Sequence, residues 1–350
     1  MGTITAVAGS SGTGGNATGR LRALEFGGWA ESRVAAVNVR VAVIGGGSWG
    51  TTVAHLCAHN TATVLYARDP AVADGVNATG ENSRYLPGRR LHPDLRATSD
   101  IAEAAGGADA VVMGVPSHGF RDTLRQLRPH IGDRTPVVSL TKGLEAQTRK
   151  RMTEVVADEL PGRPAGVLTG PNLAKEILAG HAAAAVLAMA PPDTPTAEML
   201  RDVLCANDFR VYTNTDVVGA EIAGATKNVI ALAAGIADGL GSGDNTRATL
   251  ITRGLAEVTR LGMALGGEPL TFAGLAGIGD IVATCVSAQS RNRHVGERLG
   301  RGETIDEIVA SMDQVAEGVK STPVVASLAR SLAVDMPITE EVRAVIEDGR

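Results

Sequence analysis

The sequence predicts a doubly wound α/β sheet followed by an all-α C-terminal domain, and three observations carry this prediction. Short runs rich in Val, Ile and Leu alternate with helical segments over residues 39–212. Glycine-rich or polar turns follow several of these runs, whereas the chain beyond Asp216 shows helical patterns alone. We therefore expect an N-terminal extension over 1–37, a sheet domain over 38–215 and a helical domain over 216–350.

The overall composition restricts the classes of function. The 350 residues carry a net charge of -5 and only 3% are aromatic, so the chain offers neither the basic surface nor the stacking platforms that nucleic acids bind. The three cysteines, Cys57, Cys205 and Cys285, are odd in number and widely spaced. They form no disulfide or metal framework and suit a reducing cytoplasm, where we expect the protein. Lys227 interrupts the best apolar run, so we expect no membrane span.

The first 37 residues differ from the rest of the chain. Residues 8–19 are Gly, Ser, Thr, Ala and Asn without periodicity, which is the composition of a disordered linker. They lack the basic start and apolar core of a secretory signal. We expect a disordered extension, although a mis-assigned start codon accounts for these residues equally well.

A glycine-rich turn follows the first β-rich run. The sequence G-G-G-S-W-G lies between the predicted strand 39–44 and the predicted helix 51–59, which is the context that the G-x-G-x-x-G pattern requires. Gly45 would allow the tight turn, Gly47 would let the backbone approach a pyrophosphate, and Gly50 would let the helix pack on the sheet. The helix N-terminus would supply N–H groups and a positive dipole to the phosphates. The sheet domain is therefore predicted to be a Rossmann-like dinucleotide-binding domain.

The second predicted strand, residues 63–66, ends close to Arg68 and Asp69. An acid at this strand end holds the ribose 2′-hydroxyl of NADH, whereas a guanidinium can pair with the 2′-phosphate of NADPH. Because Arg68 comes first, NADPH is favoured, and because Asp69 follows at once, NADH stays open. The alternative for Arg68 is a solvated loop charge.

Two later strands each run into a polar loop. Lys142 follows the predicted strand 135–140, and Gly170-Pro-Asn172 follows the predicted strand 165–169. Open α/β sheets bind ligands outside the carboxyl ends of their strands, so these loops are candidate parts of a site. The alternative for Lys142 is an exposed loop lysine.

Residues 218–235 are almost entirely small or aliphatic and predict a helix that is buried nearly all round, with Asp216 as its N-cap. The middle of this helix carries Lys227, followed by Asn228. A lysine is almost never fully buried without a partner. Lys227 therefore either extends its ammonium to water or acts as a general acid or base, and the other candidate residues favour the second interpretation.

Two further groups of polar residues follow in the helical domain. Residues 272–281 are too rich in glycine for a stable helix, but Asp280 lies at the start of one, as an N-cap or as part of a site. Ser290, Arg291 and Asn292 combine a hydroxyl, a guanidinium and an amide, which together can bind a phosphate without a metal. An exposed basic helix end is the alternative for this group.

Over residues 39–350 the chain resembles the bacterial NAD(P)-dependent glycerol-3-phosphate dehydrogenases. The segments that carry the resemblance are GGGSWG, TKGLE, GPNLAKE, GATKNVIALAAGIADG, RATLITRGLAE, GLAGIGDIVATC, AQSRNR and MPITEEV. The resemblance implies an oxidoreductase that reduces dihydroxyacetone phosphate to sn-glycerol 3-phosphate, reversibly, for glycerophospholipid synthesis. It also implies a Rossmann domain, a helical substrate domain and an active site between them.

The same resemblance implies roles for individual residues. Lys227 would donate the proton to the ketone oxygen, with Lys142, Asp280 and Asn228 orienting the site. The substrate would contact Lys142, Gly170, Asn172, Lys227, Asp280, Ser290, Arg291 and Asn292. Besides the three glycines of the turn, the dinucleotide would contact Ser48, Trp49, Arg68, Lys142, Ala174, Arg291, Val315 and Glu317. Asn172 stands where relatives commonly have Ser or Thr, and the turn 59–61 is one residue shorter than usual.

Two other functions fit parts of the pattern. A related two-domain dehydrogenase could act on a hydroxy acid or acyl thioester, but Ser290, Arg291 and Asn292 favour a small phosphate ester. A non-catalytic NADPH-binding regulator would keep the glycine-rich turn without needing Lys142 and Lys227 together. The sequence leaves the oligomeric state open, with a homodimer as the candidate assembly.

Overall fold

In a computed structural model, the described residues are 39–312 and 316–350. The predicted extension over 1–37 and the predicted dinucleotide contact Val315 lie outside them. The described residues group as one packing unit. The boundary between residues 215 and 216 therefore stays a prediction.

Among the described residues, eight strands form one sheet in the order β3-β2-β1-β4-β5-β6-β7-β8. Neighbouring strands are parallel except for β6 and β7, which are antiparallel. The strands are β1 Arg40–Ile44, β2 Ala62–Tyr66, β3 Arg96–Thr98, β4 Ala110–Met113, β5 Val137–Ser139, β6 Ala165–Thr169, β7 Ala183–Met189 and β8 Phe209–Asn214. The strand order reverses at β1, which lies between β2 and β4, and ligands of open α/β sheets bind at this point.

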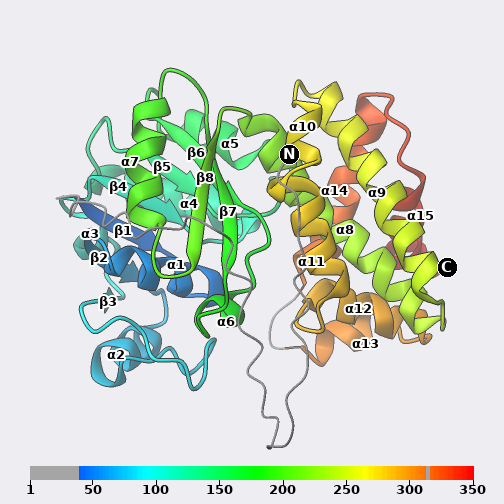
Figure 1. The fold of residues 1–350 in the computed structure, drawn as a ribbon, viewed down its shortest axis with the longest axis horizontal. Coiled ribbons are helices and arrows are strands. Elements are labelled where there is room, and N and C mark those ends of the chain that lie inside the picture. Colours follow the sequence, from blue (N-terminus) through cyan, green and yellow to red (C-terminus); the bar gives the residue numbers. More distant parts are fainter. Residues whose placement is uncertain (1–38, 313–315) are drawn as a thin grey trace, which may run out of the picture. The chain divides into compact units, whose positions relative to one another are not determined.

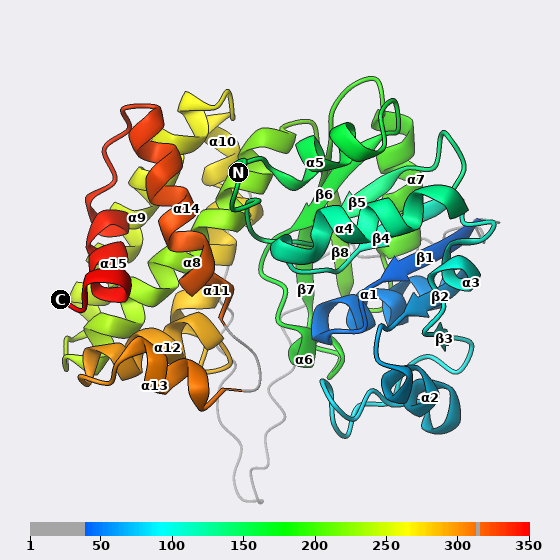
Figure 2. The same ribbon diagram turned by 180° about the vertical axis from the view of Figure 1, so that it is seen from behind.

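Helices cover both faces of the sheet, so its central strands are buried on both sides. Along β1, Val41 and Val43 pack on one face, whereas Ala42 and Ile44 pack on the other, which follows the two-residue period of a strand. Figures 1 and 2 show the two faces. One carries α1 Ser48–Ala58, α2 Pro70–Thr79, α6 Ala174–Ile177 and α7 Thr194–Leu204, and the other carries α3 Ile101–Ala105, α4 Ser117–Leu127 and α5 Met152–Glu159. A short 3-10 turn, Arg128–His130, follows α4.

The chain after the sheet is helical, and the helix that carries Lys227 lies at its centre (Figure 1). The elements are α8 Val217–Gly239, α9 Asp244–Ala264, α10 Pro269–Phe272, a π-helical turn Leu275–Gly279, α11 Asp280–Val286, α12 Arg291–Gly300, α13 Ile305–Ala310, α14 Glu317–Ser331 and α15 Pro337–Asp348. Nearly every residue of α8 is buried, as its composition predicts. The predicted N-cap is confirmed, because the Asp216 carboxylate accepts the N–H of Gly219 at 2.7 Å.

Three local features differ from the sequence prediction. β3 was missed, because its three residues, Arg-Ala-Thr, carry no alternation long enough to recognise. Leu275–Gly279 is helical despite its glycines, in a π-helical turn that continues into α11. The helix after the glycine-rich turn begins at Ser48 rather than at Thr51.

Helices α8 and α12 approach until their backbones touch. A Cβ added to Gly235 would lie 2.0 Å from the carbonyl oxygen of Arg293, and one added to Gly296 would lie 2.2 Å from that of Leu232. The same approach recurs one turn further along both helices. Because only glycine allows it, this contact sets where the first turn of α12 lies, beside Asn228 of α8.

Two helical segments of the described chain are long and apolar enough to cross a membrane, judged by length and hydropathy alone: Val217–Gly239 and Pro269–Val286. The apolar window of the first is 94% buried inside the protein, as in a core helix, and that of the second is 44% buried. For the first segment, length and hydropathy are therefore weak evidence for a membrane span.

Candidate functional site

Lys227 lies in the middle of α8 and is 7% exposed. Its Nζ donates to Asp280 Oδ1 at 2.5 Å and to Thr284 Oγ1 at 2.7 Å. The alternative interpretation, in which the ammonium extends into bulk water, does not fit this burial. Two of its three N–H donors are engaged in the described residues, which leaves one for a ligand.

Lys142 reaches the same carboxylate from the loop that follows β5. Its Nζ donates to Asp280 Oδ2 at 2.6 Å and to the carbonyl oxygen of Gly170 at 2.8 Å. Burial lowers the pKa of Lys142 to about 8, the Asp280 charge opposes this shift, and the Lys227 charge adds to it. The alternative of an exposed loop lysine is thereby wrong, since the side chain is 13% exposed and two of its three N–H donors bond within this cluster.

Asp280 is the first residue of α11 and is 1% exposed. Its two carboxylate oxygens each accept from a different lysine, so the group bridges two ammonium ions instead of capping the helix. The N-cap position belongs to Gly279. Two lysines and one aspartate leave a net positive charge in a buried setting, which favours an anionic ligand.

Sequence reasoning missed Thr284 in this cluster. Its hydroxyl accepts from Lys227 and donates to the carbonyl oxygen of Asp280 at 2.6 Å. The available signal was its spacing, because residues four apart share one face of a helix and Asp280 was already a candidate.

A chain of amides joins three helices at the site. Asn228 Nδ2 donates to the carbonyl oxygen of Lys142 at 3.4 Å, and Asn292 Nδ2 donates to Asn228 Oδ1 at 2.9 Å. Asn292 Oδ1 in turn accepts the N–H of Gly318 at 2.9 Å. Asn228 and Asn292 are therefore locked in orientation, and the start of α14 is tied to the cluster.

The other predicted residues of α12 and α14 lie around these amides. Ser290 caps α12 by accepting the N–H of Arg293 at 3.2 Å and is buried, whereas Arg291 is exposed. The alternative interpretation, an exposed basic helix end, is therefore correct for Arg291 but not for the buried Ser290 and Asn292. Burial raises the pKa of the Glu317 carboxyl, and the nearby positive charges oppose this shift. Because these charges belong to Arg291, Lys227 and Lys142, Glu317 lies within electrostatic reach of the cluster.

Asn172 has an unusual environment for a polar side chain. Both its Oδ1 and its Nδ2 are buried and have no hydrogen-bond partner in the described residues. An unpaired buried amide costs free energy, about 1–3 kcal/mol for each group, so a ligand that pairs with it would be favoured. The preceding Gly170 adopts φ +131°, which lets the loop turn tightly against the backbone of β7.

The glycine-rich turn has the geometry that a dinucleotide needs. Gly45 adopts φ +129°, and a Cβ on Gly50 would lie 2.0 Å from the Gly45 carbonyl oxygen. A Cβ on Gly47, by contrast, would meet nothing within 4 Å, so the space beside it can receive a pyrophosphate. Helix α1 begins there without an acid in its first turn or a side-chain cap. The buried Trp49 Nε1 has no hydrogen-bond partner in the described chain, so it is available to donate to a ligand at this turn.

Asn82, which sequence reasoning did not single out, braces this turn. Its Nδ2 donates to the carbonyl oxygen of Gly46 at 2.9 Å and to Thr51 Oγ1 at 2.8 Å, and the residue is 1% exposed. Its partners lie more than 30 positions away in sequence, so no local pattern identifies this role.

At the end of β2, the two candidate residues are used differently. Asp69 caps α2 by accepting the N–H of Ala71 at 3.0 Å and pairs with Arg84 at 2.6 Å. Arg68 is exposed. Burial lowers the pKa of His118, and the charges of Lys320 and Arg68 lower it further, so Arg68 lies within electrostatic reach of His118. Asp69 is therefore committed to local structure, whereas Arg68 faces solvent at the strand end.

In the described residues, no group of three or more His, Cys, Asp or Glu side chains is arranged to hold a metal ion. The rings of His55, His59 and His92 contact one another edge to face, but they are not arranged to hold a metal ion. His55 Nδ1 accepts the N–H of His92 at 2.9 Å, so its Nε2 carries the proton in the neutral ring. Burial, and then the charges of His59 and His92, lower the pKa of His55 to about 4.

A surface cavity of about 240 Å³ contains none of the predicted site residues. It is lined by Thr148, Arg149, Lys150, Arg151, Glu154, Ile222, Leu265, Leu328 and Ser331. Two of its basic side chains are already paired, Arg151 with Glu221 and Lys150 with Asp158, so we assign no ligand to it.

Comparison with known proteins identifies the family. Residues 40–194 match the model of the NAD-dependent glycerol-3-phosphate dehydrogenase N-terminus, and residues 216–350 match that of its C-terminus. The chain is 56% identical over 314 residues to "Glycerol-3-phosphate dehydrogenase [NAD(P)+] 2" of Sphingopyxis alaskensis, with 90% of this chain and 94% of the relative covered. It is 55% identical to "Glycerol-3-phosphate dehydrogenase [NAD(P)+]" of Mycobacterium avium, with 89% and 91% covered.

Solved structures agree with this assignment. The crystal structure of glycerol-3-phosphate dehydrogenase from Coxiella burnetii is similar with a TM-score of 0.85 and 37% identity, covering 89% of this chain and 96% of that one. D-mandelate dehydrogenase in complex with NADH has a TM-score of 0.58 at 11% identity, covering 89% and 98%, and shares the fold alone. The protein is an NAD(P)-dependent oxidoreductase that belongs to the NAD-dependent glycerol-3-phosphate dehydrogenase family.

Proposed function

We propose that this protein reduces dihydroxyacetone phosphate to sn-glycerol 3-phosphate with NADPH or NADH, reversibly, and so supplies glycerophospholipid synthesis. The observation that carries the proposal is the buried Lys227–Asp280–Lys142 cluster in a chain of this family. A general acid, a carboxylate that accepts a hydrogen bond from it and a second lysine suit reduction of a phosphorylated ketone.

When bound, the dinucleotide would supply a hydride to the carbonyl carbon of the substrate. Lys227 gives the proton of its free N–H to the carbonyl oxygen as the alkoxide develops, which contributes about 10²- to 10⁴-fold. Asp280 accepts a hydrogen bond from a second N–H of Lys227 and Thr284 accepts one from the third, so the two residues fix the direction of the free N–H. The remaining acceleration comes from positioning, because the substrate is held by groups remote from the reacting bond.

The substrate phosphate would lie at the start of α12. Arg291 offers a planar fork of donors, and the helix N-terminus adds a positive dipole. Lys142 contributes its one free N–H, and Asn172 contributes an amide that has no partner in the described chain. Ser290 and Asn292 complete this side of the site, with Gly170 lining it.

The dinucleotide would lie along the turn that begins with Gly45. Gly47, Ser48, Trp49 and Gly50 would hold its pyrophosphate, and Ala174 and Glu317 would also contact the dinucleotide. For the adenosine end, NADPH is favoured because Asp69 is occupied by Ala71 and Arg84, whereas Arg68 is exposed at the strand end.

One assay tests the substrate and the cofactor together. Purified protein is given dihydroxyacetone phosphate with NADH and with NADPH, and oxidation of the dinucleotide is followed by absorbance; pyruvate and ketopantoate are assayed as competing substrates. Turnover of the phosphorylated ketone with at least one dinucleotide supports the proposal. Binding of NADPH without such turnover would contradict it, and turnover of a hydroxy acid alone would favour a different dehydrogenase.

The cytoplasm is the proposed location, supported by three cysteines that are free in the structure. A homodimer is the proposed assembly. Light scattering of the purified protein at assay concentration tests it, and a monomer mass there would contradict it.

A further inference from the structure

Lys142 lies on a segment of the chain whose path no helix or strand determines. The segment runs from the end of β5 at Ser139 to the start of α5 at Met152. Near Lys142 its backbone is held by Thr141, whose Oγ1 donates to the carbonyl oxygen of Val115 at 2.6 Å. Since Lys142 must reach Asp280 from another part of the fold, the rest of this segment has to be restrained as well.

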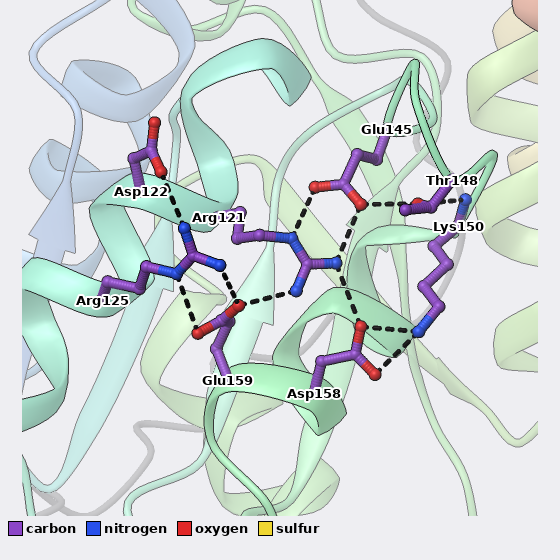
Figure 3. A network of polar contacts seen from close by, with 8 residues as sticks. All are labelled: Arg121, Asp122, Arg125, Glu145, Thr148, Lys150, Asp158 and Glu159. Atoms are coloured by element: carbon purple, nitrogen blue, oxygen red, sulfur yellow. Dashed lines mark hydrogen bonds and ion pairs between the residues drawn. The ribbon is translucent and has the colours of Figure 1, made fainter.

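Glu145, three residues after Lys142, supplies that restraint (Figure 3). Arg121 of α4 donates two parallel hydrogen bonds to it, from Nε at 2.7 Å and from a terminal nitrogen at 2.8 Å. Thr148 Oγ1 donates to the same carboxylate at 2.5 Å, which closes the turn of the segment. The other bonds of Arg121 go to Glu159 at 2.6 Å and Asp158 at 3.0 Å, both on α5.

This pair differs from an ordinary surface ion pair. The side chains of Arg121 and Glu145 are only 20% and 10% exposed, and the two planar groups meet in the bidentate arrangement that fixes relative orientation. The hydrogen bond from Arg121 lowers the pKa of the Glu145 carboxyl, and the bond to Glu145 raises the pKa of Arg121. Both groups therefore stay charged throughout the pH range of an assay.

Other contacts make the segment a connection between the sheet and the helical region. Leu144 packs against α8 in the core that contains Ile222 and Ala223. Asn228 donates to the backbone of Lys142 itself. Glu145 and Lys142 are three residues apart on a segment that has no helix or strand. A shift at Glu145 would therefore move the Lys142 ammonium relative to Asp280.

We propose that Arg121 and Glu145 are positioning residues for Lys142: their paired hydrogen bonds hold residues 141–149 where the Lys142 ammonium contacts Asp280 and Gly170. This inference rests on the proposed function, in which Lys142 contributes to the reactive site. A purely structural role is the competing explanation, since the same network also joins α4 to α5.

Arg125 provides a matched control. It lies one turn further along α4 and shares Glu159 with Arg121, donating to it at 3.2 and 3.1 Å. Its remaining contact is Asp122 on its own helix, so among the described residues it has no bond to the segment 141–149. Arg125→Gln thus removes part of the α4–α5 connection while leaving the Lys142 segment in place.

The experiment compares Arg121→Gln, Arg121→Lys, Glu145→Gln and Arg125→Gln with the unchanged protein. The rate of reductive methylation of Lys142 is followed by mass spectrometry against pH, and kcat, KM and the melting temperature are measured alongside. Arg121→Gln and Glu145→Gln are expected to lower kcat about tenfold or more, because small misplacements in a site have effects of this size. They should also move the Lys142 labelling curve toward higher pH, as the freed amine becomes solvated.

The other two variants separate the explanations. Arg121→Lys keeps the charge but loses the fork, so partial recovery of kcat is expected, and Arg125→Gln should leave kcat and the labelling curve within twofold of the unchanged protein. If Arg121→Gln and Glu145→Gln lower only the melting temperature, the positioning role is wrong. Labelling needs no substrate, so absence of turnover in the unchanged protein would count against the proposed function while the labelling curves still decide the positioning role.

Discussion

Two lysines meet at one carboxylate, but they come from regions of the molecule that are built in opposite ways. Lys227 extends from α8, a helix whose backbone is set by internal hydrogen bonds and by burial on nearly all sides. Lys142 extends from a loop between β5 and α5 that is held by side-chain contacts. The helix can position a side chain through packing alone, whereas the loop needs specific polar partners, and the two should respond differently to substitution.

The largest effect is expected at the helix lysine. Lys227→Ala should lower kcat by about 10²- to 10⁴-fold, because the general acid is lost, while the dissociation constant for NADPH changes little. Lys227→Arg keeps a positive charge that cannot be given up as a proton and should be almost as inactive. Steady-state kinetics and fluorescence titration measure the two quantities; a kcat within tenfold of the unchanged protein would remove Lys227 from this role.

Asp280 joins the two regions, so its neutral variant tests both at once. Asp280→Asn leaves two ammonium groups without their counter-charge in a buried site, and breaking such a pair costs about 3–5 kcal/mol of unfolding free energy. Urea denaturation measures the loss. Asp244→Asn is the control, because Asp244 is 95% exposed in its pair with Arg247 and should change stability by less than about 1 kcal/mol.

The helix side of the comparison depends on the contact between α8 and α12. Gly296→Ala forces a methyl group against the Leu232 carbonyl and should destabilise the protein by about 1–3 kcal/mol. It should also raise KM for the phosphorylated substrate, since Ser290 caps α12 and Arg291 is its first residue. Gly75→Ala inside α2 meets only ordinary contact at 3.6 Å and should instead stabilise by about 0.5–1 kcal/mol. Equal effects of the two substitutions would contradict the close approach of the helices.

The loop lysine should determine the response to alkaline pH. The pKa of Lys142 is about 8 in the fold and 10.5 in the reference state, so the unfolded chain binds more protons between these values. Below about pH 8 the buried ammonium costs stability, and this cost is relieved as the pH rises toward 10.5. Activity should change in the other direction, with kcat/KM falling above about pH 8 as the charge is lost. In Lys142→Arg this alkaline limb should move beyond the measured range; an unchanged limb would assign it to another group.

The regions also differ in how far sequence could predict them. The glycine-rich turn, the Lys227 helix and the N-cap Asp216 follow from local patterns, because the residues that define them are neighbours in the chain. The antiparallel placement of β7 does not, since its apolar composition suits either direction. Roles for Asn82 and the Arg121–Glu145 pair could not be predicted either, because each depends on partners that only folding brings together.

By itself the sequence determined the alternation of strands and helices, the dinucleotide turn and the presence of an amine inside an apolar helix. These properties arise from the φ/ψ preferences and the periodicity of adjacent residues. Only the tertiary structure decided that Lys142 and Lys227 share the carboxylate of Asp280, which lies 138 positions from Lys142 in the sequence. A buried charge is stable only beside its partner, and the partner's position is set by the packing of the whole chain.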